Sequence, residues 1–309
     1  MRGDSISKLI LTWWIAITVV TGHFASDASA ATDTLPPGEA LGSMTSDDGN
    51  ATVVVYGSPH QLGGVRHLAF YDSKGNLRTL VVGRHAGIRY VMSADGYVAV
   101  AGQLAGGEGA GTYLTLYSPL GGRQWERQLS PGRVLVIDLD VAPTGARTAL
   151  LVQDRDWGGP CRQLRIFGGH GLAVATRELP WAGWLQFCGG GSFLAVTTRD
   201  DISLFSPVSG KRLWRVPVET GVMYGRLCAM SPDASMMVLL DRVRVKPADK
   251  TELVWRATRL DVKKGSIIGR QTLPGTWTPS TERPIRYDPA RRAFVVASKQ
   301  GDFTLTWGQ

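Results

Sequence analysis

One pattern recurs six times along the chain, about once every 46 residues, and it limits the possible folds more than any other feature. In each copy a hydrophobic segment ends in a turn built on Ser/Ala-x-Asp-Gly or a degenerate form of it, and a run rich in Val, Ala and Leu follows. The six turns lie at 44–49, 92–96, 141–145, 187–191, 230–234 and 287–291. A repeat of about 40 to 50 residues made of short strands is typical of a β-propeller, in which each copy forms one four-stranded blade. The sequence therefore predicts an all-β fold, a six-bladed β-propeller.

A second element recurs in the latter half of the repeats. A strand that ends in Tyr or Phe runs into a turn containing Gly, and another strand follows. The examples lie at 68–75, 114–121, 164–169 and 202–210, with a looser one at 258–265. Alternating apolar and polar residues on both sides of such turns indicate antiparallel hairpins. If the strands of a blade are named A to D from the axis outward, this hairpin joins C to D, and the Asp-Gly turn joins A to B.

The sixth repeat ends at its third strand, Phe303–Trp307, and the chain offers a candidate for the missing fourth strand at its other end. Strand D of three earlier repeats runs into a Leu-Pro or Leu-x-Pro linker, at Leu129, Leu179 and Leu273. Leu35-Pro36 repeats this signature near the start of the chain. We therefore expect residues near Thr32–Leu35 to pair with Asp302–Trp307 as strand D of the last blade, which closes the ring and covers an exposed edge.

The first thirty residues have the features of a signal peptide. Arg2 and Lys8 precede an apolar run, Leu9–Val20, and a polar stretch then ends in Ala28-Ser29-Ala30, an A-x-A cleavage signal. The apolar run is shorter than the roughly 20 residues that a membrane-spanning helix needs. The sequence predicts a signal peptide at 1–30 and a single propeller domain at 31–309; the alternative is that the first segment remains as an uncleaved anchor. The protein is then periplasmic or secreted, with no membrane span after cleavage.

Composition agrees with an exported β domain. Hydrophobic residues make up 43% of the chain and charged residues 19%, and the 38 glycines and 16 prolines suit a fold with many turns. The net charge of +8 favours contact with an anionic envelope component, although simple solubility explains it equally well. No run of Lys and Arg interleaved with aromatic residues suggests a nucleic-acid groove, so no nucleic-acid partner is expected.

Three cysteines, Cys161, Cys188 and Cys228, leave at least one thiol unpaired within a monomer. An exported protein can form one disulfide, but the sequence does not select its members. The chain has no C-x-x-C motif and no Cys/His cluster, which disfavours zinc, haem and thioredoxin-type sites. We expect no cofactor.

The segment Ser206-Pro207-Val208-Ser209-Gly210-Lys211-Arg212-Leu213-Trp214 resembles the turn-Gly-x-x-x-Trp element of quinoprotein-type repeats, and Gly122-Arg123-Gln124-Trp125 is a shortened version. The chain is thus similar, at the level of fold, to the WD40-like and quinoprotein-like β-propeller superfamily. The resemblance implies that Trp125 and Trp214 pack between blades. The quinone-dependent members have larger rings and an adjacent cysteine pair, which this chain lacks, so their cofactor is not implied here.

The predicted B–C loops are uneven in length, with long ones at 57–64, 103–111, 154–160 and 241–250. Since loops on a rigid scaffold carry function, these loops and the D–A linkers at the same end mark the expected binding face. Tryptophan and arginine are the side chains most enriched in interface hot spots. The candidate binding residues are His60, Trp157, Trp181, Trp184, Arg242, Arg244 and Trp277. The alternative interpretation is that the tryptophans plug the ring and the charges solvate the loops. No residue pattern indicates a metal site or a catalytic residue.

These features favour an exported, non-enzymatic propeller that acts as a scaffold and binds another envelope protein or an anionic envelope component. The alternative is a metal-dependent hydrolase or lyase, lactonase-like, with its site in the central channel. Asp138, Asp140, Gln186 and Arg226 are conceivable members of that site, because they fall on predicted inner strands.

Overall fold

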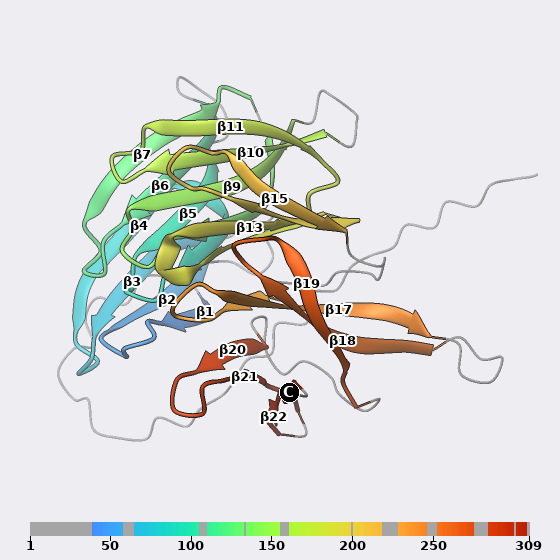
Figure 1. Ribbon diagram of the computed structural model, residues 1–309. Coiled ribbons are helices and arrows are strands. Elements are labelled where there is room, and N and C mark those ends of the chain that lie inside the picture. The colour runs from blue at the N-terminus through green and yellow to red at the C-terminus, as the bar shows by residue number, and fades with distance from the viewer. Residues whose placement is uncertain are drawn as a thin grey trace, which may run out of the picture. The chain divides into compact units, whose positions relative to one another are not determined.

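The computed structural model describes residues 39–57, 65–104, 110–132, 134–154, 161–198, 200–217, 228–245, 252–274, 284–299 and 301–307. All of them belong to one compact unit, Pro36–Gln309. The predicted signal peptide and the predicted closing strand at Thr32–Leu35 lie outside the described residues. Apart from one 3-10 turn at Gly189–Gly191, the regular structure of the described residues is entirely β (Figure 1).

The strands form five antiparallel sheets in sequence order. The first sheet has seven strands: β1 (Glu39–Thr45), β2 (Ala51–Gly57), β3 (Val65–Asp72), β4 (Leu77–Met92), β5 (Val98–Leu104), β6 (Gly111–Tyr117) and β7 (Arg123–Ser130). The next two have four strands each: β8 (Val134–Val141), β9 (Arg147–Asp154), β10 (Cys161–Gly168) and β11 (Ala173–Pro180), then β12 (Trp184–Cys188), β13 (Phe193–Thr197), β14 (Asp201–Phe205) and β15 (Arg212–Pro217). The last two contain β16 (Cys228–Met230), β17 (Met236–Val245), β18 (Glu252–Asp261) and β19 (Ser266–Thr272), then β20 (Ile285–Asp288), β21 (Ala293–Val296) and β22 (Phe303–Thr304).

The long strand β4 belongs to two repeats at once. Its first half pairs with β3 and its second half with β5, so the seven-stranded sheet contains two successive groups of four. The sequence repeats therefore correspond to β1 through early β4, late β4 through β7, β8–β11, β12–β15, β16–β19 and β20–β22. We number them repeats 1 to 6 in this order. All predicted A–B turns and C–D hairpins are confirmed, and repeat 6 has three strands within the described residues.

The Ser-x-Asp part of the A–B turn motif is a local hydrogen-bond unit. In repeat 1 the Ser46 hydroxyl donates to Asp48 Oδ1 at 2.6 Å and accepts from the Ala51 amide at 3.0 Å. Repeat 5 reproduces both bonds, with Ser231 donating to Asp233 at 2.6 Å. The serine bond, followed by bonds from nearby backbone, lowers the pKa of Asp48 and of Asp233. This chemistry explains why the motif could be recognised from the sequence.

The last position of the A–B turn needs a left-handed backbone, which explains its glycine. Gly96 has φ of 86° and Gly145 of 70°. Repeats 5 and 6 keep the same conformation without glycine, at Ala234 (φ 54°) and Arg292 (φ 50°). The degenerate copies of the motif thus form the same turn at a cost in backbone strain of about 1–2 kcal/mol each.

A β-bulge recurs at the same place in the C–D hairpins of repeats 1 to 5. The register between strands C and D shifts at Phe70/Tyr71, Leu116/Tyr117, Ile166/Phe167, Leu204/Phe205 and Arg259/Leu260. A bulge increases the local twist of the strand that contains it. Each repeat therefore twists in the same way just before its outer turn.

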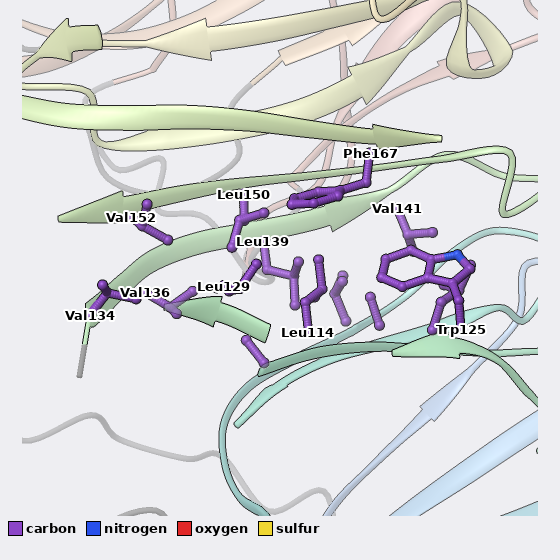
Figure 2. Close-up of a cluster of buried hydrophobic side chains, with 14 residues drawn as sticks. Leu114, Trp125, Leu129, Val134, Val136, Leu139, Val141, Leu150, Val152 and Phe167 are labelled. Atoms are coloured by element: carbon purple, nitrogen blue, oxygen red, sulfur yellow. The ribbon is translucent and has the colours of Figure 1, made fainter. Parts of the chain in front are cut away.

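Apolar cores lie between successive repeats, and inner strands are buried on both faces. In β9, Leu150 and Val152 pack in the core toward repeat 2, whereas Ala149 and Leu151 pack toward repeat 4. All four are at most 1% exposed. Figure 2 shows the core between repeats 2 and 3, where Trp125 and Phe167 lie among leucine and valine side chains. Similar cores lie between repeats 1 and 2, 3 and 4, 4 and 5, and 5 and 6.

The glycine of each C–D turn in repeats 2 to 5 is seated on the preceding repeat. A Cβ at Gly171 would lie 2.8 Å from the ring of Trp125, and one at Gly265 would lie 2.5 Å from Trp214. Equivalent Cβ atoms at Gly121 and Gly210 would overlap Thr79 and Ala175. These glycines have φ between 65° and 83°. Trp125 and Trp214 thus pack between repeats, as the resemblance implied.

Hydrogen bonds reinforce this joint. A side chain on strand D donates to a backbone carbonyl in the C–D turn of the next repeat, at four successive boundaries. The bonds run from Thr79 to Leu120 (2.6 Å), Arg127 to Gly171 (3.0 Å), Arg177 to Gly210 (3.2 Å) and Trp214 to Val262 (2.6 Å). The bonds use two pairs of positions: Arg127 and Arg177 donate to the turn glycine itself, whereas Thr79 and Trp214, two residues earlier in strand D, donate to a carbonyl that precedes it.

We expect Gly171→Ala to lower the free energy of unfolding by about 3 kcal/mol, because it adds left-handed strain and a clash with the buried Trp125 ring. Gly190→Ala is the matched control, since Gly190 has φ of 63° and no atom within 4 Å of its Cβ position among the described residues. The control should cost about 1 kcal/mol from strain alone. Urea unfolding measures both values. If both variants lowered the free energy of unfolding equally, the contact between Gly171 and Trp125 would not stabilise the boundary between repeats.

Candidate binding face

The two ends of the sheets differ in their connections. Because strands within a repeat alternate in direction, A–B and C–D turns share one end, called here the turn face, and B–C loops and D–A linkers share the other, the loop face. The A–B turns of neighbouring repeats contact one another: the Asp47 amide donates to the Ala94 carbonyl at 2.9 Å, and Ser93 Oγ donates to the Pro143 carbonyl at 2.8 Å. The turn face is thus joined by hydrogen bonds between repeats.

Of the predicted binding residues, Trp181, Trp184 and Arg242 are described in full. Arg244 lies in β17 opposite Leu253. His60, Trp157 and Trp277 fall outside the described residues. The described members belong to the linker between repeats 3 and 4, the start of β12, and the end of β17. They share the loop face but come from different repeats.

The loop predicted at Asp241–Lys250 is wrong in its first half. Strand β17 continues to Val245 and pairs with β18 as far as Val245↔Glu252. The charged residues in this stretch led to the prediction of a loop. A strand forms here because the charges at Asp241 and Arg242 are each matched by a side chain directly across the ladder.

A buried ion pair holds the base of this hairpin extension. Asp241 is 1% exposed and faces Arg256 across the ladder, whose Nε and Nη2 donate to the two carboxylate oxygens at 3.2 and 2.5 Å. The next pair along is Arg242 and Trp255, with the guanidinium 5.8 Å from the centre of the indole ring. The extension therefore presents Arg242 on a hairpin that is fixed by a two-bonded ion pair.

Trp181 combines exposure with an unusual backbone conformation. Its φ is 56°, in the left-handed region that large side chains rarely adopt, and its side chain is 53% exposed. The flanking residues hold it there: Leu179 and Ala182 are buried, Arg162 Nη1 donates to the Ala182 carbonyl, and the Gly183 amide donates to the Thr197 carbonyl at 2.8 Å. Burial lowers the pKa of Arg162. Trp181 is thus displayed by a linker that is anchored on both sides.

Trp184 has a different role. It begins β12, is half-buried, and its carbonyl accepts a hydrogen bond from Thr197 Oγ1 at 3.3 Å. Trp184 therefore differs from Trp181, three residues earlier, because it belongs to a paired strand and is half-buried. Of the described tryptophans on the loop face, Trp181 is the one that projects into solvent.

The conceivable channel residues serve contacts between inner strands. Asp138 and Asp140 on β8 are 3% and 2% exposed, and each accepts a backbone amide of β12, from Leu185 at 2.9 Å and from Phe187 at 2.7 Å. Gln186 Oε1 accepts from Cys228 Sγ at 3.3 Å. Arg226 lies outside the described residues. Among the residues that the structure describes, no three His, Cys, Asp or Glu side chains are grouped to hold a metal ion.

Sequence reasoning missed an apolar feature on the turn face. Leu120, Leu172 and Val208 sit in the C–D turns of repeats 2 to 4 and are 64%, 66% and 67% exposed. The signal was present, because each lies one or two residues from the turn glycine. Both faces therefore display apolar side chains. Of these, Trp181 on the loop face has a left-handed backbone, whereas Leu120, Leu172 and Val208 on the turn face do not.

No protein-family model and no curated protein matches the chain. Among solved structures it is similar to KlHsv2 with loop 6CD replaced by a Gly-Ser linker, with 12% identity over 84% of this chain and 77% of that one and a TM-score of 0.55. It also matches the β-propeller domain of Cps50 (Swd1) from Myceliophteria thermophila, with 12% identity, 89% and 100% coverage and a TM-score of 0.46. Hsv2 from Kluyvelomyces marxianus gives 10% identity, 86% and 72% coverage and a TM-score of 0.48. The first match shows the fold alone. In the described part of the chain, no helix is long and apolar enough to cross a membrane.

We expect Asp241→Ala to lower the free energy of unfolding by about 3–5 kcal/mol, because it leaves the Arg256 charge buried without its carboxylate. Asp302→Ala is the control: its pair with Arg286 (2.6 Å) is exposed on both sides, and its loss should cost less than about 1 kcal/mol. Denaturant unfolding of both variants checks the difference. A small effect at Asp241 would mean that the hairpin extension does not depend on the ion pair.

Proposed function

We propose that this chain, which has the WD40-like β-propeller fold, is an exported, non-enzymatic scaffold that binds another envelope protein through its loop face. The observation that carries the proposal is Trp181. A propeller is a rigid support for the loops at its ends, and such loops are common binding sites. The long B–C loops and the D–A linkers lie at the end where Trp181 projects.

Both the left-handed backbone of Trp181 and the exposure of its indole ring lower the stability of the folded protein. A left-handed backbone costs about 1–2 kcal/mol for a residue other than glycine. Glycine at this position would avoid the strain and would expose no indole. Strained backbone is common at functional sites, and tryptophan is a frequent anchor of protein interfaces. A partner that covers the ring accounts for both features of Trp181.

Charge supports a partner with an anionic surface. The chain carries a net charge of +8, and Arg242 is displayed on the same face by the β17–β18 hairpin. Arginine held over an aromatic ring loses little freedom when it binds a carboxylate, because its orientation is already restricted. We therefore infer that the bound surface carries acidic groups near an apolar patch that receives Trp181.

We further propose that the six repeats are six blades and that the segment near Thr32–Leu35 completes the last one. The residue before the linker is buried at the end of strand D in repeats 2 to 5, at Leu129, Leu179, Val216 and Leu273. Leu35 precedes Pro36 in the same way. The C–D turn glycine of repeat 1, Gly75, has φ of 79° but no neighbour within 4 Å of its Cβ position among the described residues. A strand D placed before repeat 1 would supply that neighbour.

The outward face of repeat 1 also fits a closing neighbour. Thr52, Val54 and Tyr56 on β2 are only half-buried, whereas Val53 and Val55, which face repeat 2, are fully buried. Burial and a hydrogen bond with Tyr56 raise the pKa of Tyr71 on the same side to about 12. This face is apolar enough to pack against another blade.

Leu35→Asp tests the closure. It should lower the melting temperature by about 5–10 °C, because the charge would replace a buried side chain at the last joint. Leu120→Asp is the control, since Leu120 is 64% exposed and should tolerate the charge. Differential scanning calorimetry measures both. An unchanged melting temperature for Leu35→Asp would rule out this segment as the closing strand.

Trp181→Gly separates binding from stability. It should raise the free energy of unfolding by about 1 kcal/mol by relieving the left-handed strain, and it should abolish capture of the partner from an envelope extract. Arg292→Gly is the matched control, because Arg292 has the same strain (φ 50°) on the turn face. It should gain similar stability and capture the same proteins as the wild type, as compared by quantitative mass spectrometry. Equal capture by both variants would exclude Trp181 as an anchor.

Export predicts a processed amino terminus. Protein isolated from the envelope fraction or the medium should have the mass of residues 31–309, beginning at Ala31. Intact mass spectrometry measures this directly. Full-length protein recovered with the cytoplasmic fraction would contradict the predicted compartment and leave the loop face to be tested separately.

A further inference from the structure

The sequence left open which of three cysteines could pair, and the structure brings two of them together. Cys188 ends β12, the innermost strand of repeat 4, and Cys228 begins β16, the innermost strand of repeat 5. Their Sγ atoms lie 3.9 Å apart, and the side chains are 7% and 3% exposed. They meet in the apolar core between the two repeats. The pair therefore bridges a boundary between blades.

We propose that Cys188 and Cys228 form a disulfide that joins the inner strands of repeats 4 and 5. The sulfur atoms are already at van der Waals separation, and a disulfide bond of about 2.05 Å requires them to approach by about 2 Å. The pair is 40 residues apart in sequence, so the bond closes a long loop of the unfolded chain.

In the reduced protein, hydrogen bonds to Gln186 hold the two thiols next to each other. Cys228 Sγ donates to Gln186 Oε1 at 3.3 Å, and Cys188 Sγ donates to the Gln186 carbonyl at 3.5 Å. Gln186 thus holds both thiols from one strand. The bond to Cys228, then burial and the nearby Asp140 carboxylate, raise the pKa of the Cys188 thiol. In the folded protein Cys188 is consequently protonated and a poor nucleophile.

The buried environment of the two thiols determines whether the disulfide forms before or after repeats 4 and 5 pack together. A buried, protonated thiol reacts slowly, so the bond forms while repeats 4 and 5 are still unpacked. One thiolate attacks oxidised glutathione, forms a mixed disulfide and releases one glutathione thiolate. The second cysteine thiolate attacks the cysteine sulfur of that mixed disulfide and releases the other glutathione. The two cysteine thiols lose two protons and two electrons, and oxidised glutathione becomes two molecules of glutathione.

The pairing itself rests only on the geometry, whereas its occurrence in the cell rests on the proposed export to an oxidising compartment. The first experiment tests the geometry alone. Unfolded, reduced protein is refolded with oxidised glutathione, denatured, and treated with N-ethylmaleimide before intact mass and peptide mapping. The wild type should keep one alkylated thiol, at Cys161, and Cys161→Ser should keep none. Both should give a linked Cys188–Cys228 peptide.

Folded protein exposed to the same glutathione should react at least tenfold more slowly than refolding protein. Three alkylated thiols after refolding, a persistent glutathione adduct, or a linked peptide containing Cys161 would each overturn the proposal. Because these readouts use the wild type and Cys161→Ser, they do not depend on whether variants of the core cysteines fold.

The second experiment measures the consequence. Oxidised wild type and oxidised Cys161→Ser should melt about 5–10 °C above their reduced forms. The variant Cys188→Ala/Cys228→Ala should melt at one temperature with or without a phosphine reductant. A melting temperature of the wild type that does not respond to reduction would contradict a stabilising bond at this boundary.

The third experiment separates the two proposals. Protein isolated from the envelope fraction under alkylating conditions should carry the linked peptide. If refolding forms the bond but the isolated, processed protein is reduced, the pairing stands in vitro and its use in the cell is refuted. If the isolated protein is unprocessed and reduced, the proposed export fails and the pairing chemistry does not.

Discussion

The contact on which the rest of the structure depends is the seat of each C–D turn on the preceding strand D. Gly171 lies against Trp125 and Gly265 against Trp214, with left-handed backbones that leave no space for a Cβ. The hydrogen-bond donors always belong to the earlier repeat and the acceptors to the later one. Because each C–D turn packs on strand D of the repeat before it, the C–D turn of repeat 1 has no such strand within the described residues. Repeat 6 has three described strands and can take a fourth, outer strand. This is the physical basis of our proposal that a strand near Leu35 closes the ring.

The same joint places different structural constraints on the two faces. On the turn face, A–B turns bond to each other and C–D turns are seated on the neighbouring repeat, so their lengths and glycines are set by packing. Within the described residues, these joints use no residue of the loop-face connections, and the lengths of these connections differ from repeat to repeat. Ala234 and Arg292 on the turn face are strained because they occupy an A–B turn position that needs a left-handed backbone and is glycine in other repeats. Strain at Trp181 has no such origin, which is why it supports a binding role.

Much of the fold could be predicted because its signals are local. Ser46 and Asp48 complete their turn with hydrogen bonds inside six residues, and the same unit at Ser231 made the repeat visible. Trp125 could be assigned to a joint because its segment resembles the turn-Gly-x-x-x-Trp element of quinoprotein-type repeats, in which the tryptophan packs between blades. The extension of β17 could not be predicted, because the side chain that neutralises Asp241 is Arg256, on the other strand of the hairpin. Charges read along the chain indicate a loop until their cross-strand partners are known. The sequence predicted a binding face and not a defined site, which stays a prediction, and the display of Trp181 depends on a backbone angle that no residue pattern indicates.

Polar contacts also join the inner strands of neighbouring repeats. Asp138 and Asp140 bind the backbone of β12, and Gln186 on that strand receives Cys228 from β16. Outer strands are joined by side chains packed against turn glycines and by hydrogen bonds to turn carbonyls, while inner strands are joined by hydrogen bonds that Asp138, Asp140 and Gln186 accept. A carboxylate that accepts a buried amide contributes more than a neutral acceptor does, because its charge strengthens the bond in a poorly solvated site. A covalent bond between Cys188 and Cys228 extends the same arrangement by one boundary, from repeats 3 and 4 to repeats 4 and 5. In the described part of the chain, the inner strands of repeats 3, 4 and 5 are therefore joined by specific hydrogen bonds in addition to apolar packing.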